Sequence, residues 1–274
     1  MSRRVWIHVA AACLMAIGGC EPPPDATRPQ GIRIASLSPA MTTTLQQAGL
    51  GKYLVGRSAF CRGVEHLPVV GDLQRVNVEQ LVRLSPTHVF VQRSPDGVDG
   101  VLRHLAEANG WHIVAQPLID LHDVQALLRR LPIVFSKAGI AVRCQSLTDK
   151  ITEALRPIEV DARPSLLIVS PGPSPLAWGR ETYLGQLVEA GGGTNLLGGE
   201  TWTTLSLEDI ARLAPDLVLI PSDGDPGDLA ALETAAGADR LRVLSYPALD
   251  LPGPHLVALA PEIRSIISSY TRLP

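Results

Sequence analysis

Hydrophobic and polar positions follow the same order in two segments that lie far apart in the chain. Residues 79–91 (EQLVRLSPTHVFV) align without gaps on residues 208–220 (EDIARLAPDLVLI). Each copy combines an amphipathic helix, opened by an acid and closed before a proline, with a continuous apolar run typical of a buried parallel strand. A helix-to-strand unit used twice at this separation indicates two similar α/β lobes rather than a solenoid. Two facing lobes form a cleft, and clefts bind ligands.

Strand and helix patterns alternate through the first half of the chain. The helix after the first strand should take its N-terminal cap from Thr42, Thr43 or Thr44, so that its amide groups point to the cleft side of a parallel sheet. Gly110 should end the last helix of this half. The predicted strands are 32–37, 54–55, 69–71, 88–92 and 112–115, and the predicted helices include 79–85 and 100–109.

The second half repeats this alternation after a long helical stretch. Residues 123–156 have a helical pattern with breaks near Pro132 and Gly139. Residues 140–155 alone would extend about 24 Å as a helix, enough to bridge two small lobes as a rigid strut. The polar residues 198–204 should form a loop. The predicted strands are 165–170, 216–221 and 242–245, with helices at 183–190, 208–214, 229–236 and 256–270, so an α/β fold with mainly parallel sheets is expected.

The N-terminal residues have the pattern of an export signal. Arg3 and Arg4 precede an apolar run, residues 5–17, that is too short to span a bilayer as a stable helix. The order Leu-Met-Ala-Ile-Gly-Gly-Cys that ends at Cys20 resembles the bacterial lipobox, so we expect Cys20 to become a lipidated N-terminal residue. Ordinary cleavage beside an unmodified cysteine is the alternative. The proline-rich residues 21–30 should form an extended tether.

Composition narrows the functional class. The formal net charge is −3, and removal of a leader that carries Arg3 and Arg4 makes it more negative, so the surface does not suit a nucleic-acid partner. No later apolar stretch reaches the length of a transmembrane helix. Cys61 and Cys144 belong to the body that should fold, and in an exported protein they could form a disulfide or stay free.

No common catalytic signature accompanies this pattern. The sequence lacks a nucleophile elbow, a zinc-protease helix motif, a paired-cysteine motif and a phosphate loop, which weighs against an enzyme. The glycine run 191–193 follows a helix rather than a strand and should end that helix. The histidines have no paired ligand spacing, and a structural role is favoured for them. His255, in a proline-glycine loop before the last helix, is the exception that a cleft could use.

Two groups of residues are candidates for binding. Phe60, Trp178 and Trp202 fall in segments expected to be loops between the lobes, and aromatics form only 4% of the chain, which favours a surface for a ligand over simple capping of hydrophobic loops. Glu79 and Glu208 open the two copies of the repeated helix. They either stabilise helix N-termini, as acids commonly do, or form a pair of exposed carboxylates that bind basic pockets on a partner.

A set of segments resembles the class III periplasmic binding proteins, which are the cobalamin, siderophore and haem carriers of ABC importers. The resemblance spans residues 31–274. It rests on Ile34–Pro39, Val55–Gly56, Val70–Gly71, Asn77–Pro86, Gly185–Asn195 and Trp202–Asp216.

The resemblance implies two Rossmann-like lobes joined by a long rigid helix, with a ligand held between them with little closure. It also implies that Glu79 and Glu208 engage arginines of a permease. The chain is most similar to cobalamin-binding proteins, although Leu73 replaces a tryptophan and Arg62 with Gly63 replaces an Asp-Tyr-Pro sequence. The ligand-binding residues expected from the sequence and this resemblance are Ser38, Pro39, Phe60, Gln92, Leu176, Trp178, Trp202 and His255.

These observations predict an exported, membrane-anchored lipoprotein that captures a cobalt corrinoid and delivers it to an ABC permease, with a ferric siderophore or haem as alternative ligands. We expect no catalysis, no resident cofactor or metal site, and a monomer. The rival classes are a free-metal binder, which needs three or four converging His, Asp or Glu ligands, and an enzyme with a reactive group in the cleft. The expected boundaries are a signal peptide at 1–19, a lipidated tether at 20–30, a first lobe at 31–121, a linking helical segment at 122–160 and a second lobe at 161–274.

Overall fold

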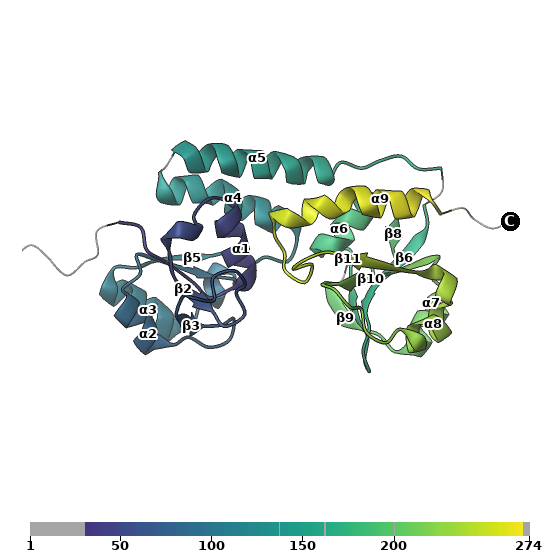
Figure 1. The fold of residues 1–274 in the computed structure, drawn as a ribbon, viewed down its shortest axis with the longest axis horizontal. Coiled ribbons are helices and arrows are strands. Elements are labelled where there is room, and N and C mark those ends of the chain that lie inside the picture. Colours follow the sequence, from purple (N-terminus) through teal and green to yellow (C-terminus); the bar gives the residue numbers. More distant parts are fainter. Residues whose placement is uncertain (1–30, 137, 162, 200, 271–274) are drawn as a thin grey trace, which may run out of the picture. The chain divides into compact units, whose positions relative to one another are not determined.

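A computed structural model describes residues 31–136, 138–161, 163–199 and 201–270. The predicted signal peptide and tether, together with the lipidation site Cys20, lie outside these ranges. Within them, no helix combines the length and the apolar character needed to cross a membrane. Figure 1 shows that the described chain builds one α/β lobe, then a pair of helices, and then a second α/β lobe.

The first lobe is built on a five-stranded sheet in which all neighbouring strands are parallel, in the order β3-β2-β1-β4-β5. The strands predicted for this lobe are confirmed, and the second continues further than predicted, to Ser58. Its elements are β1 (Ile34–Ser36), α1 (Pro39–Gln47), a 3-10 turn (Gly51–Tyr53), β2 (Leu54–Ser58), β3 (Val69–Gly71), α2 (Val78–Leu84), β4 (His88–Val91), a second 3-10 turn (Pro95–Gly97), α3 (Gly100–Asn109) and β5 (His112–Ala115).

The second lobe has a mixed sheet in the order β11-β10-β6-β7-β9, with β8 paired to β6. The strands β11, β10 and β6 are parallel, whereas β7 is antiparallel to both of its neighbours. Its elements are β6 (Ser165–Ser170), β7 (Leu176–Trp178), α6 (Tyr183–Ala190), β8 (Thr194–Asn195), β9 (Trp202–Thr204), α7 (Leu207–Leu213), β10 (Leu217–Ser222), α8 (Ala230–Ala236), a 3-10 turn (Ala238–Arg240), β11 (Leu241–Ser245), a 3-10 segment (Pro254–Leu259) and α9 (Ala260–Ser268). The predicted α/β class with mainly parallel sheets is confirmed.

Two adjacent helices, α4 (Leu121–Phe135) and α5 (Ala138–Ala154), connect the lobes (Figure 1). The break predicted near Pro132 is wrong, because Pro132 lies inside α4 close to its C-terminal end, where a proline removes one helical hydrogen bond. The break predicted near Gly139 is confirmed, since α4 ends at Phe135 and α5 begins at Ala138, one residue before Gly139. The connection is therefore a packed pair of helices rather than one long helix.

The repeated sequence forms the same unit in both lobes. The side chain of Asn77 caps α2 and that of Ser206 caps α7, each by accepting a backbone N–H from three residues further on. The helices end at Ser85 and Ala214, which both adopt left-handed backbone with φ of 44° and 45°, directly before a proline. The chain then enters β4 or β10, so the helix-to-strand unit predicted from the sequence pattern is confirmed.

Alternate residues of the central strands enter cores on opposite faces of each sheet. In the first lobe, Ile34 and Phe90 pack in a cluster with α1, α4 and α5, whereas Ala35 and Val89 pack in a cluster with α2 and α3. The second lobe follows the same plan, with α6 and α9 on one face and α7 and α8 on the other. The cluster that contains α4 and α5 includes buried residues of both lobes, so one continuous core joins them.

Further local predictions need correction. The cap of α1 is Ser38 rather than a threonine: its Oγ accepts from the Met41 amide at 3.2 Å, and Pro39 takes the first helical position, where proline is favoured. Trp178 and Trp202 lie in strands, β7 and β9, rather than in loops, because these short segments pair with each other across the sequence. The last helix starts at Ala260, after the 3-10 segment, rather than at residue 256.

Candidate ligand-binding site

Polar side chains meet where the strand order of the first sheet reverses, between β1 and β4. Ligands of open α/β sheets bind outside the carboxyl edge at such a switch point. Ser38 follows β1 and donates from Oγ to Gln92 Oε1, just beyond β4, at 2.5 Å, and Gln92 Nε2 donates to the Leu118 carbonyl at 3.3 Å. Ser38 and Pro39 are buried, so they hold Gln92 in position rather than present their own surface.

A cavity of about 360 Å³ contains both Gln92 and Trp202 in its lining. The loops after β4 and β5 form one side of it, and the edge strand β9 of the second lobe contributes Trp202. Its volume lies in the range of small-molecule sites. The remaining lining residues are Arg93, Ser94, Gly97, Pro117, Leu118 and Ile119.

The β7–β9 ladder forms the side of the site that belongs to the second lobe. Trp178 pairs with Trp202 and Leu176 pairs with Thr204, so these side chains lie on one face of the ladder. Trp178 is buried and belongs to the core, whereas Leu176 and Trp202 expose 40% and 37% of their surfaces. The register thus brings three predicted ligand residues together, with two of them accessible.

Phe60 lies on the turn after β2, at the carboxyl edge of the first sheet, and exposes 70% of its surface. Next to it, Cys61 is buried, with its Sγ 3.0 Å from Thr42 Oγ1, and burial raises the pKa of this thiol. Cys144 is also buried and free, and burial raises its pKa to about 11. The two cysteines therefore do not form the disulfide that the sequence left open.

Arg93 is a site residue that the sequence analysis missed. It lines the cavity beside Gln92 and also an adjacent cavity of about 210 Å³ that contains Leu73. Its guanidinium donates to the Leu73 carbonyl. Its position directly after Gln92, at the carboxyl end of a parallel strand, was the signal that could have identified it.

His255 does not line the cavity that holds Gln92 and Trp202. Its Nε2 donates to the Ala248 carbonyl at 2.9 Å, and its ring stacks on Tyr246 at a centroid distance of 6.2 Å. Burial is the main cause that lowers the pKa of His255. These contacts give His255 a structural role in the loop before α9.

The wall of the cavity formed by residues 117–119 is tied to helix α6 of the second lobe. The Tyr183 amide donates to the Ile119 carbonyl at 3.2 Å, and the Leu121 amide donates to Gln186 Oε1 at 2.9 Å. Gln186 also donates from Nε2 to the Asp120 carboxylate at 3.1 Å, and the loop continues directly into α4. One side of the site is thus a fixed junction between the lobes.

Glu79 and Glu208 occupy the second positions of α2 and α7, one in each lobe. Both are exposed, and among the described residues neither makes a side-chain hydrogen bond or ion pair. The following residues differ, because Asp209 bonds Ser206 and Arg212 whereas the equivalent position in α2 is Gln80. The two glutamates therefore present unpaired carboxylates at equivalent positions of the two lobes.

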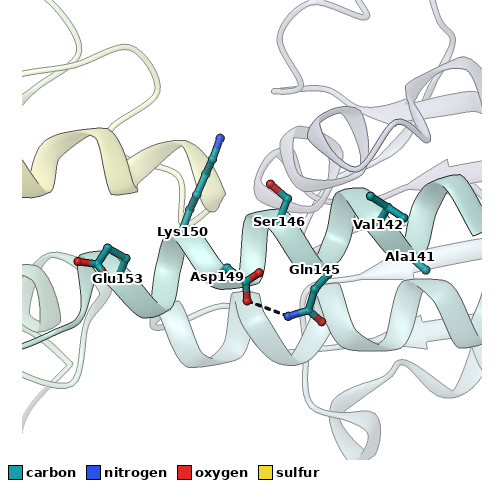
Figure 2. Close-up of a pocket in the computed structure, with 7 residues that line it drawn as sticks. All are labelled: Ala141, Val142, Gln145, Ser146, Asp149, Lys150 and Glu153. Atoms are coloured by element: carbon teal, nitrogen blue, oxygen red, sulfur yellow. Dashed lines mark hydrogen bonds between the residues drawn. The ribbon is translucent and has the colours of Figure 1, made fainter.

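A larger hollow lies along the outer side of α5, but it lacks the character of a binding site. Figure 2 shows that all its side chains come from this one helix, and Gln145 is satisfied by donating to Asp149 at 2.8 Å. The hollow is open to solvent and contains none of the residues at the carboxyl edges of the sheets. We therefore place the candidate site at the cavity between Gln92 and Trp202.

Solved structures similar to this chain include periplasmic proteins that bind haem or vitamin B12. The haem-binding protein HutB of Vibrio cholerae has a TM-score of 0.69 and 18% identity, covering 86% of this chain and 98% of its own. The haem-binding protein RhuT from Roseiflexus sp. RS-1, in apo form, has a TM-score of 0.66 and 21% identity, with coverages of 87% and 98%. The vitamin B12-binding protein BtuF of Vibrio cholerae has a TM-score of 0.66 and 17% identity, with the same coverages.

No protein-family model matches the chain, and no curated protein matches it either. The similarity to the solved structures nevertheless covers nearly their whole length. The chain therefore has the fold of the class III periplasmic binding proteins, as the resemblance predicted.

Proposed function

We propose that this chain is the solute-binding component of an ABC importer and that it carries a cobalt corrinoid without acting on it chemically. The observation that carries the proposal is the cavity that Gln92 of the first lobe and Trp202 of the second share, at the switch point of the first sheet. Support also comes from the fold, which is shared with proteins that bind vitamin B12 or haem.

The lining of the cavity favours a corrinoid over haem. Haem iron is held in proteins by His, Tyr, Cys or Met side chains, and none of these residue types lines this cavity. A corrinoid whose cobalt already carries its axial ligands needs mainly packing surfaces and a few polar groups. Trp202 supplies exposed apolar surface in the cavity, and Gln92 supplies a fixed amide. Leu176 and Phe60 do not line the cavity, and they expose further apolar surface on the two lobes.

Haem is the second candidate, because two of the three similar structures described above are haem-binding proteins. A ferric siderophore is a further ligand of the same general size class. A free metal ion is less well supported, because the described residues contain no group of three or more His, Cys, Asp or Glu side chains able to hold one.

We propose that Glu79 and Glu208 dock this protein to the permease. Their support is the equivalent placement of two exposed, unpaired carboxylates, one in each lobe. Anchoring through a lipid on Cys20, after export, would keep the carrier near the permease; Cys20 lies outside the described residues. A monomer is enough for this role.

Titration with candidate ligands tests the proposed function. Purified protein is titrated separately with cyanocobalamin, haemin and a ferric hydroxamate siderophore, and binding is followed by absorption spectroscopy and calorimetry. Saturable binding of cyanocobalamin at one site, weakened by Trp202→Ala but not by Val142→Ala on the outer side of α5, would support the proposal. If haemin alone bound saturably, haem rather than a corrinoid would be the assigned ligand. If none of the three ligands bound, the proposal that the protein carries a corrinoid, haem or a siderophore would be wrong.

A further inference from the structure

An ion pair crosses from one lobe to the other at the side of the site that carries Phe60. Arg62 follows β2 of the first lobe, and its guanidinium contacts the Asp223 carboxylate, which follows β10 of the second lobe. Within the part of the chain that the structure describes, this is the one ion pair that joins the two lobes. Both strands end at the carboxyl edges of their sheets, so the contact lies at the edge where ligands of such folds bind.

The two partners of this pair are held very differently. The Asp223 carboxylate is fixed, because its Oδ1 also accepts from the Ala248 amide at 2.9 Å. Arg62 has a long side chain with 60% of its surface exposed, and it lies with Gly63 at a tip between the buried residues Cys61 and Val64. Opening the contact therefore requires movement of the arginine side chain and tip, and no loss of core packing.

Electrostatics favour the closed arrangement. Asp223 hydrogen-bonds to Arg62, and this is the main cause that lowers the pKa of Asp223, so its carboxylate stays ionised at neutral pH. Asp250 adds a second negative charge near Arg62. The guanidinium thus faces two acids of the second lobe, and salt should weaken this attraction because the pair is exposed.

The opposite boundary of the site has no such weak point. In the described part of the chain, the loop 117–121 is held to α6 by three hydrogen bonds and no ion pair: the Tyr183 amide donates to the Ile119 carbonyl, the Leu121 amide donates to Gln186 Oε1, and Gln186 Nε2 donates to the Asp120 carboxylate. The loop then runs directly into α4. Hydrogen bonds with at least one neutral partner respond less to salt than an exposed ion pair does. Of these two boundaries, the Arg62–Asp223 side is the one that can open by a change of a single side chain.

We propose that the Arg62–Asp223 pair is a latch between the lobes that must open for a ligand to enter or leave the site. This inference rests on the proposed function and adds to it the step that limits ligand exchange. An exposed ion pair changes an opening equilibrium by about 1.5- to 5-fold. Loss of the latch should therefore raise the association and dissociation rate constants together by about this factor, while the equilibrium Kd changes by less than about twofold.

The test uses Arg62→Gln, Asp223→Asn and the double variant in the full-length protein. Asp223→Asn keeps an oxygen that can accept from Ala248. Stopped-flow fluorescence with cyanocobalamin and with haemin measures both rate constants at low salt and at about 1 M NaCl. Each single variant should exchange ligand faster, the double variant no faster than either, and high salt should accelerate only the wild type. Arg156→Gln removes an exposed ion pair outside the site, with Glu153, and should leave the rates unchanged.

A readout without ligand separates this proposal from the proposed function. Amide hydrogen exchange of a peptide that contains Gly63, at the tip that carries Arg62, should accelerate in Asp223→Asn, while a peptide from the buried strand β6 should not change. Unchanged exchange at Gly63 together with additive effects on the rates would overturn the latch. A weaker Kd without faster exchange would make Arg62 a ligand contact instead. If neither probe binds, the ligand assignment fails, and hydrogen exchange still decides whether the latch exists.

Discussion

Replacement of Trp202 by alanine should weaken ligand binding without unfolding the second lobe. The side chain exposes 37% of its surface, which for an aromatic of about 250 Å² leaves roughly 90 Å² for a ligand to cover. At about 25 cal/mol per Å², full coverage contributes about 2 kcal/mol, and half coverage about 1 kcal/mol. Since about 1.4 kcal/mol is tenfold in Kd, we expect Trp202→Ala to weaken binding roughly 5- to 40-fold.

The variant should lose some stability, because most of the Trp202 side chain is covered by protein, but the backbone pairing of β7 with β9 does not depend on that side chain, so the second lobe should stay folded. Calorimetric titration with the ligand identified for the wild type measures the loss, and Trp202→Phe should retain part of the affinity. Val142→Ala, which shortens an exposed apolar residue on α5, is the matched control and should bind as the wild type does. Unchanged affinity of a folded Trp202→Ala variant would remove Trp202 from the site.

Three further predictions concern docking, pH and anchoring. Alanine at both Glu79 and Glu208 should preserve ligand affinity but reduce uptake through a matched permease, most strongly at low salt; wild-type uptake would make them ordinary helix-terminal acids. Burial, followed by the nearby charge of His112, lowers the pKa of His88 to about 4, below the unfolded value of about 6.5. The free energy of unfolding should therefore be highest above pH 6.5 and should decrease by about 1 to 3 kcal/mol as the pH falls towards 4. Urea unfolding should show a smaller decrease for His88→Asn than for the exposed control His104→Asn. Cys20→Ser should release the protein from membranes, and equal membrane association of both forms would contradict lipidation.

Local patterns determined the repeated units well, because their signals lie within a few residues. The acid-led helix, the proline after it and the apolar run specify α2 with β4 and α7 with β10, whatever the rest of the chain does. The signal for the α1 cap was also local: Ser38 followed by Pro39 is a common helix start, and the threonines at 42–44 lie inside the helix.

The short strands β7 and β9 of the second lobe could not be predicted from a local sequence pattern. β7 and β9 have three residues each, too few to show an alternation of polar and apolar positions, and they exist because they pair with each other. The aromatics at Trp178 and Trp202 were recognised as candidates from their rarity. That they share one face of a ladder follows from the register, which the sequence does not contain.

The contacts that define the site are also long-range. Ser38 meets Gln92 across 54 positions and Arg62 meets Asp223 across 161 positions, and each partner alone is an ordinary polar residue in a loop. A motif search finds neighbours in sequence, whereas a site between lobes consists of neighbours in space. Candidate residues could therefore be named one at a time, but Arg93 and the pairing of Arg62 could not.

The continuous core explains why a small contact such as the latch can matter. Exposing three or four buried side chains, at about 1.5 to 3 kcal/mol each, would cost about as much as the whole binding free energy of a micromolar ligand, about 8 kcal/mol. Because one core runs through α4, α5 and both lobes, a wide rotation of the lobes is disfavoured by this amount. Ligand exchange must then use movements that leave the core intact, and the Arg62 side chain offers one. The same rigidity keeps the ordering cost of binding low, so affinity depends on how well the preformed surface of Gln92 and Trp202 fits the ligand.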